Sequence, residues 1–480
     1  MKPRTVTLIP GDGIGPEVVR ATCRLIAAAG AELEWDEQIA GRAVFESGDN
    51  TGVPQATIES IKRNRVALKG PLETPIGFGG KSANVTLRKL FETFGNTRPA
   101  RVYPGIETPF SDRDIDLVVV RENVEDLYAG IEYMSTPGVA QCLKLISVKG
   151  CEKIVRLAFE LAVAEGRRSV TCVTKANIMK LSEGMLKRTF ERIAEEYPGI
   201  EPRFMLVDNC AHQLVRVPEE FDVLVSTNMN GDILSDLVSG LVGGLGLAPG
   251  ANIGRDAAIF EAVHGTAPDI AGKNLANPTA TMLSGVMMLR HLGLFEAADK
   301  MEGAIAVTLA EGPRTGDICG DGPRCGTEEF TDAVIGNLGR TPEGWQAKDY
   351  RPLRMPDVSS DPVFVRPESR RTLGLDVFVE SGDSPEELGK RLEELAHESP
   401  LYLKVISNRG TVVYPPTGTP TDCVDSWRCR FLLRDHAADL DDEALYGLVR
   451  SFAGKLKVNG VTRLEELDGE RGYTLSQGED

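Results

Sequence analysis

The chain has 480 residues, of which 41% are hydrophobic and 26% are charged, as expected for a folded protein of two or three domains. Its formal net charge of -17 at pH 7 argues against binding of nucleic acid, which requires a basic surface. No apolar run approaches the roughly 18–20 residues of a membrane-spanning helix and no secretory signal precedes the first predicted strand, so we expect a cytoplasmic protein that binds no membrane.

Short apolar runs alternate with helical patterns from the start of the chain to about residue 340. The runs typical of buried strands are 6–9, 65–69, 116–120, 169–174 and 222–226, and the stretch 150–165 has the apolar spacing of a helix. Strands that alternate with helices predict an α/β fold, in which ligands bind near the carboxyl ends of the strands.

Arginines stand beside polar side chains in three places. Asn84 and Arg88 lie one helical turn apart, and Ser82 precedes them in a position suited to cap the helix. Arg98 follows a short distance later, and Arg121 comes directly after a predicted strand. Because the planar guanidinium group suits bidentate binding of a carboxylate, these residues predict a pocket for a substrate with several carboxylates.

Two aspartates follow the predicted strand 222–226. Asp232 and Asp236 are four residues apart, so a helix would place them on one face. Two carboxylates held together repel each other, and a hard divalent cation is their natural partner. A solvated helix face is the alternative interpretation of this spacing. The buried strand before the pair and the glycine-rich stretch 240–250 after it favour a ligand site.

The composition changes at 350–366, which is rich in proline, aspartate, serine and arginine and is predicted to be a linker. The elements predicted beyond it are strands at 373–379, 401–406, 411–414, 427–433 and 463–467 and helices at 385–396 and 444–456. This order predicts a separate α+β domain at 367–480, of the ferredoxin-like type with one additional strand.

Three motifs carry a resemblance to a known enzyme family: IPGDGIGPE at 9–17, RENVEDLY at 121–128, and the stretch 228–254. From Thr5 to about Asn337 the chain resembles the metal-dependent β-decarboxylating dehydrogenases of isocitrate, isopropylmalate and homoisocitrate, and as a whole it resembles the long bacterial isocitrate dehydrogenases. The resemblance implies an isopropylmalate-dehydrogenase-like fold rather than a Rossmann fold. It implies a large cofactor-binding domain at 1–95 and 245–349 and a small substrate and dimerisation domain at 96–244, with a clasp near 126–150.

The resemblance also implies an active site that two subunits of a homodimer, or of a higher oligomer, would share. The substrate-binding residues that it implies are Ser82, Asn84, Arg88, Arg98, Arg121, Tyr128 and Lys175. Asp208, Asp232 and Asp236 would hold Mg2+ or Mn2+, with Lys175 and Asp208 supplied by the second subunit. In catalysis, Lys175 or Asp208 would accept the proton of the substrate hydroxyl, and Tyr128 would protonate C3 after CO2 leaves.

The coenzyme residues that the resemblance implies are Leu72, Glu73, Thr74, Asn177, Glu261, His264, Gly265, Asp269, Ile270, Asn277 and Asp317. In NADP-linked relatives the pair at 269–270 is typically Lys-Tyr, which meets the 2′-phosphate. Asp269 would instead repel a phosphate and accept hydrogen bonds from ribose hydroxyls, so we predict NAD as the coenzyme.

The predicted function is therefore NAD-dependent oxidative decarboxylation of isocitrate. Ser82 and Asn84 are small and polar, which favours the γ-carboxylate of isocitrate over the isopropyl group of isopropylmalate. A homoisocitrate or isopropylmalate dehydrogenase is the alternative enzyme, and a non-catalytic regulatory subunit is the alternative class. Such a subunit is expected to lose Tyr128, Lys175 or a metal aspartate, all of which this chain has.

Overall fold

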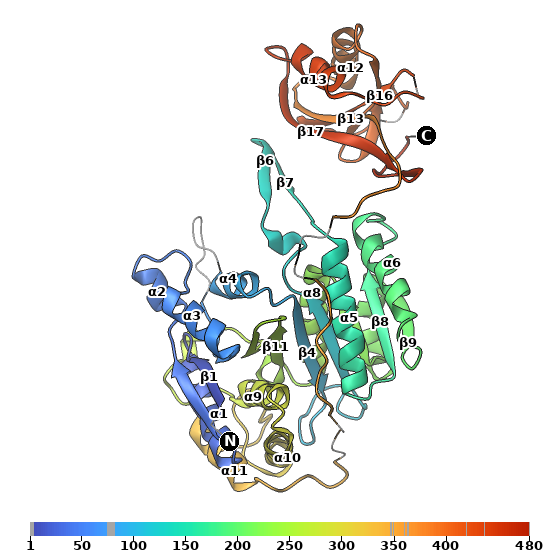
Figure 1. Cartoon of the computed structure of the whole chain (residues 1–480). Helices are drawn as coiled ribbons and strands as arrows, with labels where there is room; N and C mark the ends of the chain where they lie inside the picture. Colours follow the sequence, from blue (N-terminus) through green and yellow to red (C-terminus); the bar gives the residue numbers. More distant parts are fainter. Residues whose placement is uncertain are drawn as a thin grey trace. The chain divides into compact units, whose positions relative to one another are not determined.

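A computed structural model describes residues 4–73, 82–345, 348, 350–359, 361, 364–418, 420–435 and 437–479. By their internal contacts these residues form two units. The first unit comprises 1–129 and 145–358, and the second comprises 130–144 and 359–480 (Figure 1). The finer division of the first unit into a large and a small domain stays a prediction.

The first unit is built on a 10-stranded sheet with the order β2-β1-β3-β12-β11-β4-β5-β10-β8-β9. Its strands are β1 (Arg4–Ile9), β2 (Leu33–Glu37), β3 (Val66–Lys69), β4 (Gly95–Arg101), β5 (Asp116–Glu122), β8 (Ser169–Thr174), β9 (Glu201–Leu206), β10 (Val223–Ser226), β11 (Pro249–Ile253) and β12 (Ala258–Ala262). The strands β11 and β4 pair antiparallel with both of their neighbours, whereas the other pairs are parallel. Two parallel blocks therefore meet at β11 and β4.

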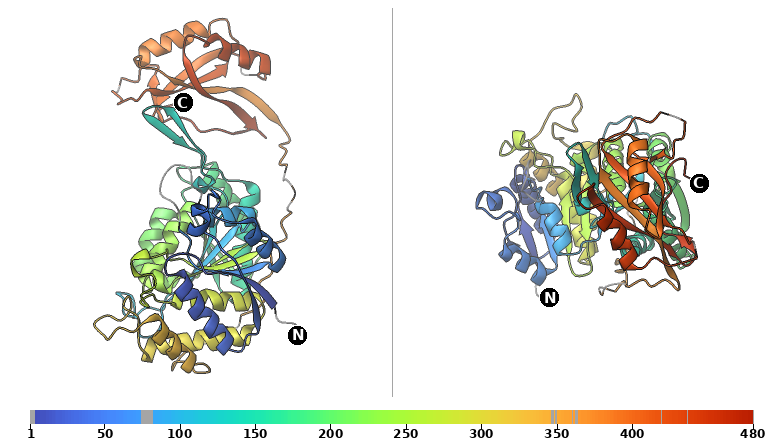
Figure 2. Two further views of the ribbon diagram at one scale, coloured as in Figure 1. Left: turned by 90° about the vertical axis from the view of Figure 1, so that its left-hand side faces the viewer. Right: turned by 90° about the horizontal axis from the view of Figure 1, so that it is seen from above.

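Helices cover both faces of this sheet (Figures 1 and 2). They are α1 (Gly15–Ala28), α2 (Arg42–Glu46), α3 (Gln55–Asn64), α4 (Ala83–Leu90), α5 (Val148–Ala164), α6 (Ser182–Ala194), α7 (Val207–Arg216), α8 (Asn228–Leu241), α9 (Thr279–His291), α10 (Phe295–Glu311) and α11 (Thr327–Gly336). The α/β prediction is confirmed, because each predicted strand of this region is a strand of the sheet and the predicted helix 150–165 is α5. Ser147 caps α5 by accepting a hydrogen bond from the Gly150 amide at 2.9 Å.

The two faces of the sheet are packed differently. Successive side chains of a strand point to opposite faces. On one face, a single apolar core runs across the sheet under α1, α9, α10, α5 and α6. On the other face, one core lies under α3 and α4 and a separate core lies under α7 and α8. The space between these two cores, over β12, β11 and β4, holds polar side chains.

The second unit contains a six-stranded sheet with the order β15-β14-β16-β13-β17-β18. Its elements are β13 (Arg370–Glu380), α12 (Pro385–Leu395), β14 (Leu401–Asn408), β15 (Thr411–Tyr414), β16 (Ser426–Leu433), α13 (Asp442–Ser451), β17 (Lys457–Leu467) and β18 (Glu470–Arg471). The order β14-β16-β13-β17, antiparallel throughout, is that of the predicted ferredoxin-like domain with β15 added at one edge. The helix predicted to reach 456 ends at Ser451, and the strand predicted from 463 begins at Lys457.

A hairpin that comes from the middle of the chain belongs to the second unit. It is formed by β6 (Glu132–Thr136) and β7 (Val139–Cys142). The Thr136 hydroxyl donates to Asp425 Oδ1 at 2.8 Å, and Asn459 Nδ2 donates to the Ser135 carbonyl. The predicted clasp region therefore packs against the C-terminal domain of its own chain. Across the described ranges, the helices are too short or too polar to span a lipid bilayer.

Candidate active site

A row of polar side chains crosses the sheet of the first unit between the two separate cores. It consists of Lys69 on β3, Glu261 on β12, Asn252 on β11, Asn96 on β4 and Arg121 on β5. Lys69 is paired in register with Glu261, Asn252 with Asn96, and Asn96 with Arg121. All five residues are at most 7% exposed, so this row is a buried polar network rather than a solvated surface.

A cavity of about 120 Å³ lies over this row. Its lining residues are Pro71, Leu72, Asn84, Arg88, Asn96, Arg98, Gly250, Glu261, Ala262, Val263, His264 and Gly265. Asn84 Oδ1, Arg88 Nε and His264 Nε2 are buried and have no hydrogen-bond partner within the described part of the chain. Because buried polar atoms are normally paired, three such atoms around one cavity favour a ligand rich in hydrogen-bonding groups.

The carboxylate pair lies on α8, which begins directly after β10. Asp232 Oδ1 is 3.2 Å from Arg98 Nη1 and is also paired with Arg121. Asp236 Oδ1 is 3.3 Å from the same Arg98 nitrogen. The Tyr128 hydroxyl donates a hydrogen bond to Asp232 Oδ2. The predicted repulsion between the two carboxylates is therefore relieved in a single chain by arginine.

The electrostatics of this cluster differ from one residue to the next. Burial opposes ionisation of Asp232, but the Arg121 guanidinium, the hydrogen bond from Tyr128 and the Arg98 guanidinium together outweigh it and lower the pKa of that carboxyl. Burial raises the pKa of Asp236, which has fewer favourable contacts. Burial and the hydrogen bond to Asp232 raise the pKa of Tyr128, so the phenol stays protonated near neutral pH.

Lys175 and Asp208 form a second pair, in which Lys175 is half-buried and Asp208 is exposed. Lys175 directly follows β8, and its ammonium is 2.7 Å from Asp208 Oδ1 on α7. Lys175 lowers the pKa of Asp208. The described residues of one chain contain no group of three acidic, histidine or cysteine side chains arranged to hold a metal ion. The predicted set of Asp208, Asp232 and Asp236 is therefore not assembled within one chain.

Of the coenzyme residues predicted from the resemblance, four line the cavity: Leu72, Glu261, His264 and Gly265. The Glu73 amide donates to Asp12 Oδ2 at 2.8 Å. Asn277 Nδ2 donates to Asp317 Oδ2 at 2.9 Å. Thr74 lies outside the described residues, and Asn177 is exposed in the turn after Lys175.

The loop 263–271 follows β12 and contains His264, Gly265, Asp269 and Ile270, which were also predicted as coenzyme residues. His264 lines the cavity, and burial lowers the pKa of its imidazole, which favours the neutral form. Asp269 and Ile270 lie in a short 3-10 helix, Pro268–Ile270. The Lys273 ammonium donates to the Asp269 carbonyl oxygen at 2.7 Å, so a cation stands beside the position that was expected to repel a phosphate.

Three residues of the polar row were not predicted from the sequence. Lys69 is the last residue of a predicted buried strand, and a lysine at the end of such a strand could have indicated a functional residue. Asn96 and Asn252 stand in strands whose central position in the sheet becomes visible only when the pairing is known. Glu261 was predicted as a coenzyme residue, and the structure places it between Lys69 and Arg88 beneath the cavity.

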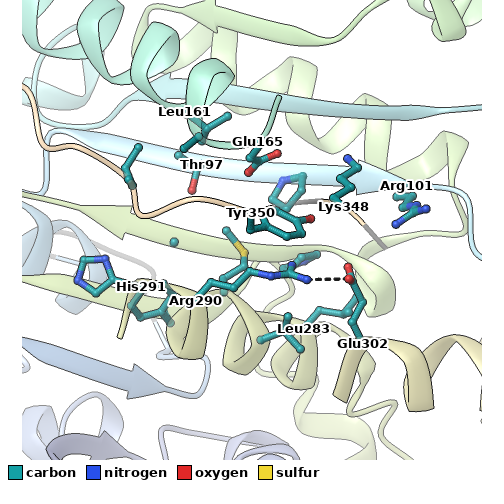
Figure 3. A pocket seen from close by; sticks show the side chains of 18 of the residues that line it. Thr97, Arg101, Leu161, Glu165, Leu283, Arg290, His291, Glu302, Lys348 and Tyr350 are labelled. Carbon is teal, nitrogen blue, oxygen red and sulfur yellow. Dashed lines mark hydrogen bonds and ion pairs between the residues drawn. The ribbon is translucent and has the colours of Figure 1, made fainter. Parts of the chain in front are cut away.

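A second pocket, of about 130 Å³, lies on the opposite face of the sheet (Figure 3). Thr97 and Arg101 of β4 line it, in alternation with the residues that line the first cavity. Its charged groups are paired with one another: Arg290 Nη2 is 2.7 Å from Glu302 Oε2, and Tyr350 stacks on the Arg290 guanidinium at 3.5 Å from the ring centroid. Because these charged groups are paired with one another, we interpret this pocket as a structural contact between distant parts of the chain and not as the candidate active site.

Known proteins resemble this chain along its whole length. It is 59% identical over 478 residues to "Isocitrate dehydrogenase [NADP]" of Thermus thermophilus, covering 99% of this chain and 96% of that one. A crystal structure of a protein from Thermus thermophilus matches with a TM-score of 0.95 at 59% identity and the same coverage. "Isocitrate dehydrogenase [NAD] catalytic subunit 5, mitochondrial" of Arabidopsis thaliana is 46% identical, over 70% of this chain and 89% of its own length.

These relatives contradict the prediction of NAD as the coenzyme. The relatives that match 99% of the chain are named NADP-dependent, whereas those named NAD-dependent match about 70% of it. The prediction of an NAD-dependent enzyme was therefore wrong. It rested on Asp269 and Ile270, with Asp317 as a further acid nearby, and a phosphate can be met by another cation, such as the Lys273 ammonium beside Asp269.

Two family models match the chain in sequence order. The model described as "Isocitrate/isopropylmalate dehydrogenase" matches residues 5–334, which include the polar row and the carboxylates of α8. The model described as "Bacterial isocitrate dehydrogenase, C-terminal domain" matches residues 370–479, the greater part of the second unit. With most of its length matched in this way, the chain belongs to the isocitrate/isopropylmalate dehydrogenase family.

Proposed function

We propose that the protein oxidises isocitrate and removes CO2 from it to give 2-oxoglutarate, with NADP as the hydride acceptor and Mg2+ or Mn2+ bound. The cavity over the polar row is the observation that supports isocitrate as the substrate. Arg88 and Arg98 line it, and Asn84 Oδ1 is buried there without a partner in the described chain. Two guanidinium groups and a small amide suit a substrate with several carboxylates and a hydroxyl.

The donor set on α8 fits a hard divalent cation. Asp232 and Asp236 supply carboxylate oxygens, and their side chains are 31% and 55% exposed, so both reach the solvent side of the cluster. Asp208 of a second copy would complete the set. When bound, the metal would polarise the substrate hydroxyl and later the ketone oxygen.

The remaining chemistry is proton transfer by side chains of this chain. Asp208 is a carboxylate paired with Lys175, and this pair is placed to accept the proton of the substrate hydroxyl. Tyr128 keeps its phenolic proton and points it at Asp232, so it is placed to donate a proton beside the proposed metal carboxylates after decarboxylation. We assign the acceptance of this proton to the pair of Lys175 and Asp208 and not to one of the two residues alone.

Exposed apolar side chains support an active site shared by two copies. On the hairpin, Tyr133, Met134 and Leu143 are 59%, 65% and 43% exposed, and on α8 Ile233 is 58% exposed. Ile233 directly follows Asp232 in the sequence, so a second copy seated on α8 would lie beside the metal carboxylates. Exposed apolar residues of this kind are typical of a protein interface.

NADP as the coenzyme rests on the names of the full-length relatives. In the loop 261–278, Lys273 is the single lysine or arginine, and it stands next to Asp269. It is therefore the side chain of this loop that is placed to meet a 2′-phosphate.

The test is steady-state kinetics of the purified chain with Mg2+. Isocitrate, isopropylmalate and homoisocitrate are each offered with NADP and with NAD, and kcat/KM is compared. We expect turnover of isocitrate by the chain alone, which a regulatory subunit would not show, and a higher kcat/KM with NADP. A higher kcat/KM for isopropylmalate would overturn the substrate, and a higher kcat/KM with NAD would overturn the coenzyme.

A further inference from the structure

The polar row contains two almost fully buried asparagines that do not contact the carboxylates of α8. Asn252 and Asn96 are each 1% exposed and lie side by side on the two central strands β11 and β4. We propose that they are positioning residues, which fix the guanidinium groups of Arg88 and Arg98 relative to each other for the substrate. The inference rests on the proposed function, because it takes these two arginines as the ones that bind the carboxylates of isocitrate.

At one end of the row, Glu261 connects Asn252 to Arg88. Glu261 Oε1 accepts a hydrogen bond from Arg88 Nη2 at 3.3 Å and another from Asn252 Nδ2 at 2.7 Å. Its other oxygen is paired with Lys69, which is fully enclosed. Because a carboxylate only accepts hydrogen bonds, it fixes the orientation of the Asn252 amide, whose Nδ2 has to face it.

At the other end, Asn96 connects Asn252 to Arg98. Asn252 Oδ1 accepts from Asn96 Nδ2 at 2.8 Å, and Asn96 Oδ1 accepts from Arg98 Nε at 2.6 Å. The guanidinium only donates, so it fixes the orientation of the Asn96 amide in turn. Both amides thus point the same way between an anion and a cation, an arrangement in which neighbouring hydrogen bonds strengthen one another.

The two arginines come from different parts of the fold. Arg88 lies on α4, above the core under α3 and α4, and Arg98 lies on β4 at the junction of the two parallel blocks. Hydrogen bonds along the row connect them across β12 and β11. A buried amide without partners is costly, and apolar side chains of similar volume would fill the same places. The presence of polar side chains in the row is explained if the row holds the guanidinium groups of Arg88 and Arg98 at a fixed separation.

A fixed separation of two guanidinium groups favours a molecule whose carboxylates match it. The arginines need not be ordered when the substrate binds, so less free energy is lost on binding. Breaking the row should therefore weaken substrate binding, which raises KM, while the proton-transferring groups Tyr128 and Lys175 are left in place and kcat changes little.

The chain offers a matched control for this idea. Asn123 is also an asparagine, is 4% exposed and donates to the same Asn252 Oδ1, at 3.0 Å. Its other hydrogen bond goes to the Thr93 carbonyl, and its own Oδ1 has no partner in the described chain, so no arginine donates to it. It shares the burial and the acceptor atom of Asn96 and lies outside the path between the arginines.

The experiment compares Asn252→Leu, Asn96→Leu and Asn123→Leu in the full-length enzyme with Mg2+ and NADP. Asn252→Leu and Asn96→Leu should each raise KM for isocitrate by about tenfold with kcat within about threefold of the wild type. Both should reduce the increase in Tm that isocitrate gives, a readout independent of turnover. The double variant should have a KM for isocitrate no higher than that of either single variant, because each single substitution already breaks the path of hydrogen bonds between Arg88 and Arg98. Asn123→Leu should keep the wild-type KM.

An equal KM increase in Asn123→Leu, or an unchanged KM in Asn252→Leu, overturns the proposal. If a leucine variant does not fold, Asn252→Ser takes its place, because a serine is too short to reach both Glu261 and Asn96. The wild type is measured first: failure to turn over isocitrate overturns the proposed function. The variants are then compared on the 2-hydroxy acid that the wild type does oxidise, which tests the row by itself.

Discussion

Glu122 shows at the scale of a single residue how burial changes charge in this fold. It is 5% exposed at the end of β5 and accepts hydrogen bonds from the Val124 amide at 2.7 Å and the Glu125 amide at 3.0 Å. Within the described ranges no lysine or arginine is paired with it. Burial raises the pKa of Glu122 to about 7, so the folded protein holds this proton at a pH at which the unfolded chain has lost it.

This raised pKa predicts a pH-dependent loss of stability. Because the folded pKa exceeds the ordinary one, Glu122 should cost no stability below about pH 4 and progressively more up to about pH 7, at about 1.4 kcal/mol per pH unit. Glu122→Gln removes the charge, so its Tm should exceed that of the wild type at pH 8 and match it near pH 4. The exposed Glu32→Gln is the control. A Tm difference independent of pH would contradict the assignment.

The two carboxylates of α8 should respond differently to substitution. Asp232 contacts Arg98, Arg121 and Tyr128, whereas Asp236 contacts Arg98 at 3.3 Å and is more exposed. Asp232→Asn and Asp236→Asn should each raise the Mg2+ concentration needed for half-maximal activity. With EDTA present, Asp232→Asn should lower Tm, because it removes the anion between two guanidinium groups, and Asp236→Asn should change Tm little. Unaltered Mg2+ dependence in both variants would place the metal elsewhere.

At the scale of elements, the start of the predicted linker is held in place by contacts with the first unit. The Arg351 amide donates to the Ala164 carbonyl at 2.9 Å, and Lys348 Nζ is 2.7 Å from Asp116 Oδ1. Tyr350 lies on Arg290 of α9 (Figure 3). The segment thus contacts both α5 and α9, and its packing joins the helices that cover the continuous core.

Tyr350 is the side chain of this segment whose loss should matter most. Tyr350→Ala should lower the free energy of unfolding by about 2 kcal/mol, since it removes a partly buried ring and its contact with the Arg290 guanidinium. Tyr350→Phe keeps the ring and should cost about 1 kcal/mol at most. Urea unfolding followed by tryptophan fluorescence measures both, and equal values for the two variants would show that the ring is not what stabilises this contact.

Elements with a strong apolar pattern could be predicted from the sequence, and elements without one could not. The run at 169–174 became β8, in which every residue is buried. The first half of β17 contains Asn459 and Gly460 and has no apolar alternation. It can be recognised as a strand only from its pairing with β13. The same limit applies to the site. Arg88, Asp232 and Asp236 could be predicted from their neighbours in sequence. Asn96 and Asn252 could not, because their hydrogen bond joins strands that are 156 positions apart in sequence.

At the scale of the whole molecule, the proposed shared site makes a prediction about mixed dimers. Tyr128 contacts Asp232 in its own chain, while Lys175 and Asp208 form a separate pair. Tyr128→Phe and Lys175→Met should each be nearly inactive alone. Unfolded together and refolded, they should recover about a quarter of the wild-type activity, because half of the dimers are mixed and each of these has one intact site. No recovery above the separate variants would contradict a site built from two chains.

The continuous core on one face of the sheet and the divided core on the other determine how this unit can move. Separating α5 from α9 would expose apolar surface at a cost of about 25 cal/mol per Å². Changing the distance between α4 and α8 exposes polar side chains, which water solvates readily. We therefore expect any hinge motion of this unit to open or close the face that carries the cavity and to leave the face with the continuous core packed.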